Sequence, residues 1–247
     1  MVNSKLINSI KSIKATVSLP LKYLIDFVLP CTCIVCGKEI SQGLVCNDCF
    51  DLVINTRSPS CPHCGRPIDK TKTCGFCRNE KYLDYGRAFA LYVPPVDTMI
   101  HHLKYRGKTN LAKFFGLGMA GVLKADYLLK EVDFLTPVPL FWWKKLRRNY
   151  NQAELLSTII HQETSVPIVE TLIRVKNTKT QTRLDHKTRQ ENVRNAFKAK
   201  NGIEIKNKKI ILIDDVMTTG ATIKECARVL KEAGAEKVYS LVSAITP

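Results

Sequence analysis

The clearest hydrophobic pattern in the 247-residue chain is a short apolar run near its C-terminus. Residues 208–213 read KKIILI, a β-branched stretch typical of a strand that is buried on both faces. Two aspartates end this run abruptly, and a loop of small residues over 216–222 follows them. Apolar positions then recur at helical spacing at Ile223, Ala227, Leu230 and Ala233. Gly234 is typical of a helix stop, so the order is strand, acidic pair, loop and helix.

The segments around this unit predict further strands and helices. Residues 133–139 predict a strand that ends in a proline-bounded turn, followed by a helix to about His161 and a strand near 168–172. A final strand is expected over 238–244. The resulting order of β-α-β-loop-β-α-β predicts an α/β fold with a mainly parallel sheet flanked by helices and ligands at the carboxyl ends of the strands.

The first 30 residues predict a basic amphipathic helix, mainly over 5–28, that caps the next domain. No apolar run in the chain approaches the roughly 20 residues that a transmembrane helix needs. Residues 21–29 are apolar enough to resemble part of a signal peptide, but Lys22 and Asp26 interrupt them and no cleavage site follows. Peripheral contact with a membrane is the less favoured alternative.

Nine of the ten cysteines lie within 47 residues and form four C-x-x-C pairs. The block repeats at an offset of 28 residues, since CIVCGKEI over 33–40 is answered by CPHCGRPI over 61–68. Each pair aims two thiolates at one ion, and two pairs close a tetrahedral zinc site. The segment 31–80 therefore predicts a small double zinc ribbon with two structural Zn²⁺ ions. The expected ligands are Cys33, Cys36, Cys46, Cys49, Cys61, Cys64, Cys74 and Cys77.

Two other uses of these cysteines are less favoured. A disulfide scaffold goes with secretion, and no export signal is recognisable. A redox role does not explain four pairs in a repeat. Sequential pairing (first pair with second, third with fourth) follows the repeat, whereas a crossed arrangement uses the same residues, and Cys31 or His63 offers a substitute ligand. A block this short has too little apolar surface to fold without its metal.

The loop after the acidic pair has the chemistry of a phosphate site. Small residues at a helix N-terminus expose backbone N–H groups and hydroxyls to a dianion. The preceding carboxylates suit a vicinal diol, so a sugar phosphate fits both features. The alternative is an aspartate pair that binds a metal, with the loop as a simple turn.

The segment IILIDDVMTTGAT resembles the phosphoribosyl pyrophosphate (PRPP) signature of type I phosphoribosyltransferases. This resemblance implies that Asp214 and Asp215 hold the ribose hydroxyls. It implies that the 5′-phosphate is held by the loop residues Thr218, Thr219, Gly220, Ala221 and Thr222. It also implies that Mg²⁺ accompanies PRPP, bound mainly by the diphosphate.

Four features in a fixed order are similar to the ComF family of competence proteins: the paired cysteines, KYRG over 104–107, RRNYNQA over 147–153, and a polar motif over 174–197 before the PRPP loop. The resemblance implies a type I phosphoribosyltransferase-like domain over 81–247. Asn149 stands where the family usually has glycine, and asparagine tolerates the left-handed backbone that this turn needs.

The ComF resemblance further implies a cytoplasmic bacterial protein of DNA uptake and natural transformation, with possible contact to the inner face of the membrane. Such a protein handles single-stranded DNA alongside a helicase and binds PRPP. In phosphoribosyltransferases, the loop corresponding to 140–152 touches pyrophosphate, and a mobile loop corresponding to 174–197 closes over the site. The alternative function is a catalytically active phosphoribosyltransferase of nucleotide metabolism or salvage with no DNA role.

Charge adds candidates for both functions. The formal net charge is +16, and half of it lies in 144–200, which favours phosphate-bearing partners. Candidate catalytic cations for departing pyrophosphate are Lys104, Arg147, Arg148 and Arg174. Candidate residues for stacking and phosphate contacts with single-stranded DNA are Trp142, Trp143, Lys144, Lys145, Arg147, Arg148 and Tyr150. The alternative for the tryptophans is core packing, with at least one of them buried. Cys226 is expected to be a small buried side chain.

Overall fold

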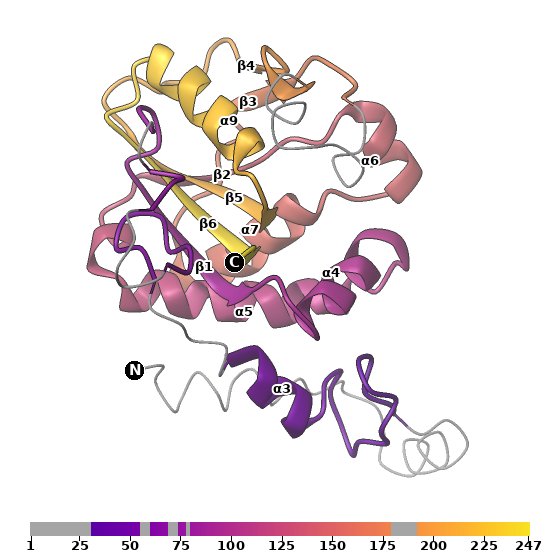
Figure 1. Cartoon of the computed structure of the whole chain (residues 1–247). Helices are drawn as coiled ribbons and strands as arrows, with labels where there is room; N and C mark the ends of the chain where they lie inside the picture. The colour runs from indigo at the N-terminus through magenta and orange to yellow at the C-terminus, as the bar shows by residue number, and fades with distance from the viewer. Residues whose placement is uncertain (1–30, 55–59, 69–73, 78–79, 179–191) are drawn as a thin grey trace.

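The computed structural model describes residues 31–54, 60–68, 74–77, 80–178 and 192–247 (Figure 1). The N-terminal helix expected over 1–30 lies outside the described residues. So does the segment 179–191, which is part of the loop expected to close over the site.

A four-stranded parallel sheet forms the centre of the fold, in the order β1-β6-β5-β2. Its strands are β1 (Tyr85–Leu91), β2 (Phe134–Pro137), β5 (Lys209–Met217) and β6 (Lys237–Ile245). The predicted α/β class with a parallel sheet is confirmed. Strand β5 continues through the acidic pair, with Asp214 opposite Val242 and Val216 opposite Ala244. The prediction that the aspartates end the strand is wrong, because the ladder with β6 carries the backbone past them.

The strand expected near 168–172 is also wrongly placed. Ile168 forms only an isolated parallel bridge with Leu135. The strand proper is β3 (Leu172–Arg174), which pairs antiparallel with β4 (Phe197–Ala199) in a separate two-stranded sheet. The chain therefore leaves the edge of the main sheet where one more parallel strand was expected.

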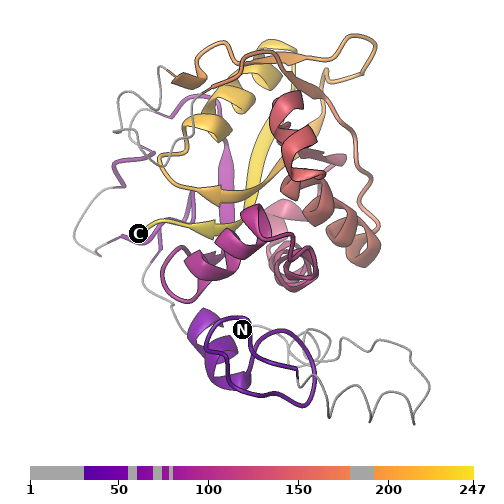
Figure 2. The ribbon, with the colours of Figure 1, turned by 90° about the vertical axis from the view of Figure 1, so that its right-hand side faces the viewer.

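Helices cover both faces of the main sheet (Figures 1 and 2). One face carries α4 (Val96–Tyr105), α5 (Asn110–Ala125) and α7 (Gln152–Thr164), and the other carries α9 (Ala221–Glu232). Shorter elements are α3 (Asn47–Ile54), η1 (Tyr127–Leu129) and α6 (Trp142–Arg148). None of the helices in the described ranges combines the length and apolar character needed to cross a membrane.

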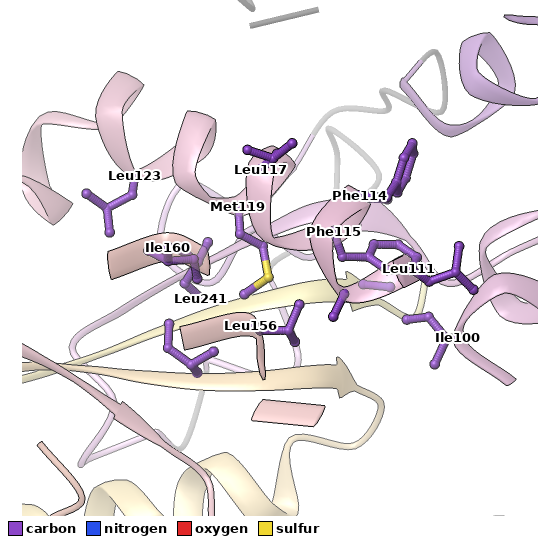
Figure 3. Close-up of a cluster of buried hydrophobic side chains, with 14 of the residues drawn as sticks. Ile100, Leu111, Phe114, Phe115, Leu117, Met119, Leu123, Leu156, Ile160 and Leu241 are labelled. Atoms are coloured by element: carbon purple, nitrogen blue, oxygen red, sulfur yellow. The ribbon is translucent and has the colours of Figure 1, made fainter. Parts of the chain in front are cut away.

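Alternating side chains of β5 supply both halves of the core. Ile211 and Ile213 pack with the α4, α5 and α7 cluster, part of which Figure 3 shows, whereas Ile210 and Leu212 pack with the α9 cluster. The same alternation places Asp215 on the α4 face and Asp214 on the α9 face. Cys226 of α9 is fully buried, as expected.

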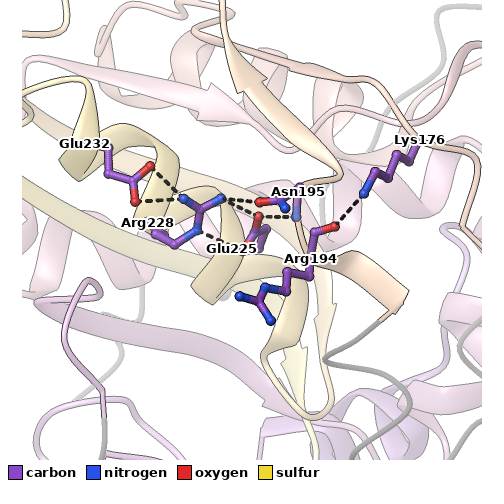
Figure 4. Close-up of polar contacts among 6 residues, drawn as sticks. All are labelled: Lys176, Arg194, Asn195, Glu225, Arg228 and Glu232. Carbon is purple, nitrogen blue, oxygen red and sulfur yellow. Dashed lines mark hydrogen bonds and ion pairs between the residues drawn. The ribbon is translucent and has the colours of Figure 1, made fainter.

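Polar contacts fix α9 to the segment before β4 (Figure 4). Glu225 accepts the backbone N–H of Asn195 at 2.7 Å and pairs with Arg228 at 2.6 Å. Arg228 also pairs with Glu232 at 2.6 Å, while Lys176 donates to the carbonyl of Arg194 at 3.1 Å. These contacts hold the small β3–β4 sheet beside α9, the helix that follows the threonine-rich loop after β5.

Candidate functional site

A cavity of about 630 Å³ opens at the carboxyl ends of β2 and β5. Its walls come from the second cysteine ribbon, α4, the β2–α6 connection, α7, β3 and the β5–α9 loop. Predicted site residues that line it are Lys104, Lys144, Arg148, Arg174, Asp214, Asp215, Thr218, Thr219 and Thr222. The fold therefore brings most of the candidate sugar-phosphate residues to one cavity. Arg147 is exposed and is not part of the lining.

The acidic pair lies beside a half-buried lysine from α4. Lys104 Nζ is 2.9 Å from Asp215 Oδ1, and the two side chains are 23% and 9% exposed. Burial works against the charged form of Lys104, but Asp215 and Asp214 outweigh it, so the pKa of Lys104 is raised. Lys104 is therefore a fixed positive charge against the carboxylates.

Asp214 is the carboxyl group whose charge is disfavoured. Burial, and then repulsion from Asp215, raises the pKa of Asp214 to about 7, although Lys104 acts in the opposite direction. Its Oδ1 accepts the backbone N–H of Asp215 at 2.8 Å. Near neutral pH, Asp214 can thus donate or accept a hydrogen bond to a ligand hydroxyl.

We expect Asp214→Asn to raise the melting temperature by about 5 °C at pH 8 and by less at pH 5. The pKa of Asp214 lies at about 7 in the folded protein, above its ordinary 3.8, so the unfolded chain releases this proton first. The free energy of unfolding therefore falls as the pH rises from about 4 to about 7. The asparagine side chain of the variant does not ionise, so the variant avoids this fall. Thermal unfolding at both pH values measures the difference. A gain at pH 5 equal to that at pH 8 would contradict the assignment.

The loop after β5 has the backbone geometry of an anion site. Gly220 adopts φ 71° as the residue before α9, a left-handed conformation that favours glycine, and Thr219 Oγ1 accepts the N–H of Ala221 at 3.4 Å. The first N–H groups of a helix have no partner within the helix and attract anions. Thr222 lines the cavity from the first turn of this 12-residue helix. A phosphate group suits this position.

Opposite the loop, two half-buried cations have no carboxylate partner among the described residues. Lys144 Nζ donates to the carbonyl of Thr178 at 2.8 Å, and Arg174 donates to the Thr178 hydroxyl. The Nε of Arg174 is buried and has no hydrogen-bond partner within the described ranges. Burial, and then the charges of Arg174 and Arg148, lowers the pKa of Lys144 to about 8. Uncompensated positive charge of this kind favours a multiply charged anion.

Helix α6 presents its tryptophans to solvent. Trp142 is 62% and Trp143 is 54% exposed, and this seven-residue helix has no buried residue. The expectation that at least one of them packs in the core is wrong, because within the described part of the chain α6 lies at the margin of the fold. Lys145 pairs with Glu154 at 2.8 Å. The Tyr150 hydroxyl donates to the carbonyl of Leu103, which ties Tyr150 to α4.

Several residues that line the cavity were not predicted as site residues from the sequence, among them Arg66, Tyr92 and Tyr105. Arg66 comes from the second ribbon, Tyr92 follows β1, and Tyr105 ends α4 beneath Arg148, whose guanidinium carbon lies 4.9 Å from its ring centroid. Tyr105 belongs to the KYRG motif and could have been found there. Asn149 adopts φ 62°, so the expected left-handed turn is confirmed.

The eight ribbon cysteines form two groups in sequential order. One group is Cys33, Cys36, Cys46 and Cys49, and the other is Cys61, Cys64, Cys74 and Cys77, with the Sγ atoms of each group within 4.8 Å of one another. A tetrahedral zinc with Zn–S bonds of about 2.3 Å separates sulfurs by about 3.8 Å. Sulfurs 3.7, 3.8 and 3.6 Å apart match that spacing. The crossed pairing is wrong, and Cys31 and His63 lie outside both groups.

Comparison with known proteins agrees with this architecture. The family model described as "Phosphoribosyl transferase domain" matches residues 112–246, and "Double zinc ribbon domain" matches residues 24–78. "Competence protein F" of Haemophilus influenzae is 31% identical over 83% of this chain and 93% of its own length. The chain belongs to the ComF family.

Two other ComF relatives match over similar lengths. "DNA utilization protein YhgH" of Escherichia coli K12 is 30% identical, covering 85% of this chain and 95% of that protein. "Competence protein ComFC" of Bacillus subtilis is 28% identical, covering 82% of this chain and 89% of that protein. The ComF architecture of a double zinc ribbon and a phosphoribosyltransferase domain therefore extends over nearly the whole chain.

Proposed function

We propose that this ComF protein binds PRPP with Mg²⁺ in the cavity at β5 and α9 and acts in DNA uptake and use. The observation that carries the proposal is the composition of the cavity. It combines an acidic pair, a helix N-terminal loop, and cations that lack carboxylate partners within the described residues. These suit a ribose, a 5′-phosphate and a diphosphate respectively. The DNA role rests on the relatives named as competence and DNA utilization proteins.

Each part of the cavity has a separate task in this proposal. Asp214 and Asp215 accept hydrogen bonds from the ribose hydroxyls, with Lys104 holding Asp215 in place. The amides and hydroxyls of Thr218–Thr222 receive the 5′-phosphate. Lys144, Arg148 and Arg174 face the diphosphate. Mg²⁺ would neutralise diphosphate oxygens, with the two aspartates supplying outer contacts.

Titration of PRPP and Mg²⁺ into the wild type and an Asp214→Asn/Asp215→Asn variant tests this site. We expect the variant to lose affinity by about 100-fold, because two charge-assisted hydrogen bonds are removed. Glu131→Gln/Glu163→Gln is the matched control, since it removes the same charge from side chains that are 81% and 39% exposed. Equal affinity of the wild type and the aspartate variant would refute the site, as would absence of binding to the wild type.

The same cavity also suits the alternative, an active phosphoribosyltransferase of nucleotide metabolism or salvage. The observation in its favour is the group of cations that suits developing charge on a departing pyrophosphate. Incubation with labelled PRPP, Mg²⁺ and candidate acceptors distinguishes the two. Pyrophosphate release with a base or nucleoside would favour the transferase, whereas binding without release with any base, nucleoside or DNA end favours a PRPP-binding competence protein.

For single-stranded DNA, we propose contact at the exposed face of α6. Trp142 and Trp143 offer stacking surfaces beside the exposed cation Arg147. We expect Trp142→Ala/Trp143→Ala to weaken oligo-dT binding by at least about tenfold, measured by fluorescence anisotropy. Tyr127→Ala is the matched control, because Tyr127 is 76% exposed on η1. Binding that is insensitive to added salt, or unchanged in the tryptophan variant, would rule out this surface.

We further propose that the protein acts in the cytoplasm, at or near the inner face of the membrane. The grouping of eight cysteines as metal ligands supports a reducing compartment, because such thiolates are not used in disulfides. A competence helicase is proposed as a partner on the ComF resemblance alone.

A further inference from the structure

The second cysteine ribbon packs directly against residues 218–222, the proposed phosphate loop. The guanidinium of Arg66 donates to the carbonyl of Thr218, and also to the carbonyl and hydroxyl of Thr246 at 3.0 Å each. The Thr246 hydroxyl in turn donates to the same Thr218 carbonyl at 3.3 Å. One carbonyl at the start of the loop is therefore held from two directions by groups outside the loop.

The same ribbon also contacts the first turn of α9. The Phe76 ring lies so close to Gly220 that a Cβ there would be 2.2 Å from its nearest atom. Lys224 Nζ lies 3.9 Å from the Phe76 ring centroid and donates to the Phe76 carbonyl at 3.1 Å. Lys224 also pairs with Glu80 at 3.0 Å, and the Glu80 side chain is only 3% exposed. The second ribbon thus contacts both the phosphate loop and the first turns of α9 and holds them together.

The first ribbon provides an internal comparison. By the 28-residue repeat, Lys38 corresponds to Arg66, and Asp48 corresponds to Phe76. Lys38 and Asp48 touch each other at 3.1 Å, but they are 65% and 73% exposed. Arg66 lies 5.2 Å from the Phe76 ring centroid, so the same two positions are in contact in both ribbons. Only in the second ribbon does the pair reach the phosphate loop.

The two ribbons also differ in their place in the fold. The first lies with α3 beyond α5, on the far side of the sheet from α9 (Figures 1 and 2). The phosphate loop begins α9, so no side chain of the first ribbon occupies the position of Arg66. Lys38 is therefore a natural control for any effect of Arg66 that acts through the loop.

We propose that Arg66 is a positioning residue for the phosphate loop, and that the second zinc ribbon is thereby a working part of the ligand site while the first is not. This inference rests on the proposed PRPP function. In a trans peptide the C=O and the following N–H point in opposite directions. Holding the Thr218 carbonyl therefore fixes the direction of the Thr219 N–H, at the point where amides must face a phosphate group.

The zinc ligands connect this contact to metal binding. Arg66 follows the ligand Cys64 by two residues, and Phe76 lies between the ligands Cys74 and Cys77. The direction of both side chains thus depends on the closed four-cysteine group. Because coupling between two binding sites is reciprocal, bound PRPP is expected to raise the affinity of the second ribbon for zinc. Release of zinc to a chromogenic chelator, with and without PRPP, reads this out without any activity assay.

Calorimetric titration of PRPP and Mg²⁺ into four forms of the full chain tests the proposal. We expect Arg66→Met to weaken affinity by about tenfold or more, Arg66→Lys to lose less, and Lys38→Met to bind like the wild type. Amide hydrogen exchange without ligand is the second measurement. Exchange over 216–222 is expected to rise in Arg66→Met, with α5 unchanged and the zinc content kept.

The outcomes separate the two proposals. If the wild type does not bind PRPP, the proposed function fails, and hydrogen exchange still decides whether Arg66 holds the loop. If Arg66→Met binds PRPP as well as the wild type and its loop exchanges no faster, the positioning role is overturned. An equal loss of affinity in Lys38→Met and Arg66→Met also overturns it, because that result would place the effect in the overall charge.

Discussion

Replacing Lys104 with methionine is expected to lower the melting temperature by about 10 °C at pH 8. Lys104 Nζ lies 2.9 Å from Asp215, whose side chain is 9% exposed, and Asp214 also raises the pKa of Lys104. Removing one partner of a buried ion pair leaves an uncompensated charge, which costs about 3–5 kcal/mol. Differential scanning calorimetry of the variant and the wild type measures the shift.

The loss is expected to be smaller at pH 5. Without the lysine, the folded-state pKa of Asp214, already raised to about 7, is expected to rise further, because burial and Asp215 raise it and the charge of Lys104 opposes them. A carboxyl group with a raised folded pKa costs stability as the pH rises above its unfolded pKa, so most of the loss is present at pH 8. Lys124→Met is the control, since its pair with Glu163 is 48% and 39% exposed and contributes little. An equal loss at pH 5 and pH 8 would show that Lys104 acts by packing instead of by charge.

The β5–α9 unit could be predicted from the sequence because its signals are local. An apolar run, two aspartates, small residues and a periodic helix follow one another within 30 residues. The end of β5 was misplaced because a strand ends where its partners end, and β6 pairs with it as far as Met217. The strand expected near Ile168 was misplaced for the same reason. Pairing with β4 determines where β3 lies, and the apolar residues near Ile168 do not reveal that partner.

The candidate site likewise contains residues that a local motif identifies and residues that only the fold brings to the cavity. The acidic pair and the threonine-rich loop have a motif, whereas Arg66 reaches the site by packing across 152 residues of chain to Thr218. Its repeat partner Lys38 is also basic, so the sequence does not show that Lys38 is exposed while Arg66 is half-buried at the site. For Trp142 and Trp143, in contrast, the sequence suggested an environment that the fold does not provide. Their apolar character suggested burial, but both side chains are more than half exposed and α6 has no buried residue.

Zinc removal is expected to unfold both ribbons while the phosphoribosyltransferase domain stays folded. The buried cluster of the first ribbon consists of Cys33, Cys46 and Cys49, with three half-buried aliphatic side chains against it. Structural zinc supplies about 10–16 kcal/mol in zinc-finger peptides, more than so small a cluster replaces. The sheet keeps its own two hydrophobic clusters on either side. Elemental analysis should therefore find two zinc ions per chain before chelation.

Limited chymotrypsin digestion measures the unfolding, because Phe50 follows the first-ribbon ligand Cys49 and Phe76 lies between the second-ribbon ligands Cys74 and Cys77. Cleavage at both is expected to become fast after chelation, and cleavage within α5 to stay slow. Cys31→Ser is the control, since Cys31 lies outside both cysteine groups and its loss should keep both zinc ions. Slow cleavage at both sites in verified zinc-free protein would show that side-chain packing, without metal, holds the ribbons. Phe76 should become accessible later than Phe50 when PRPP is bound, because only the second ribbon contacts the phosphate loop.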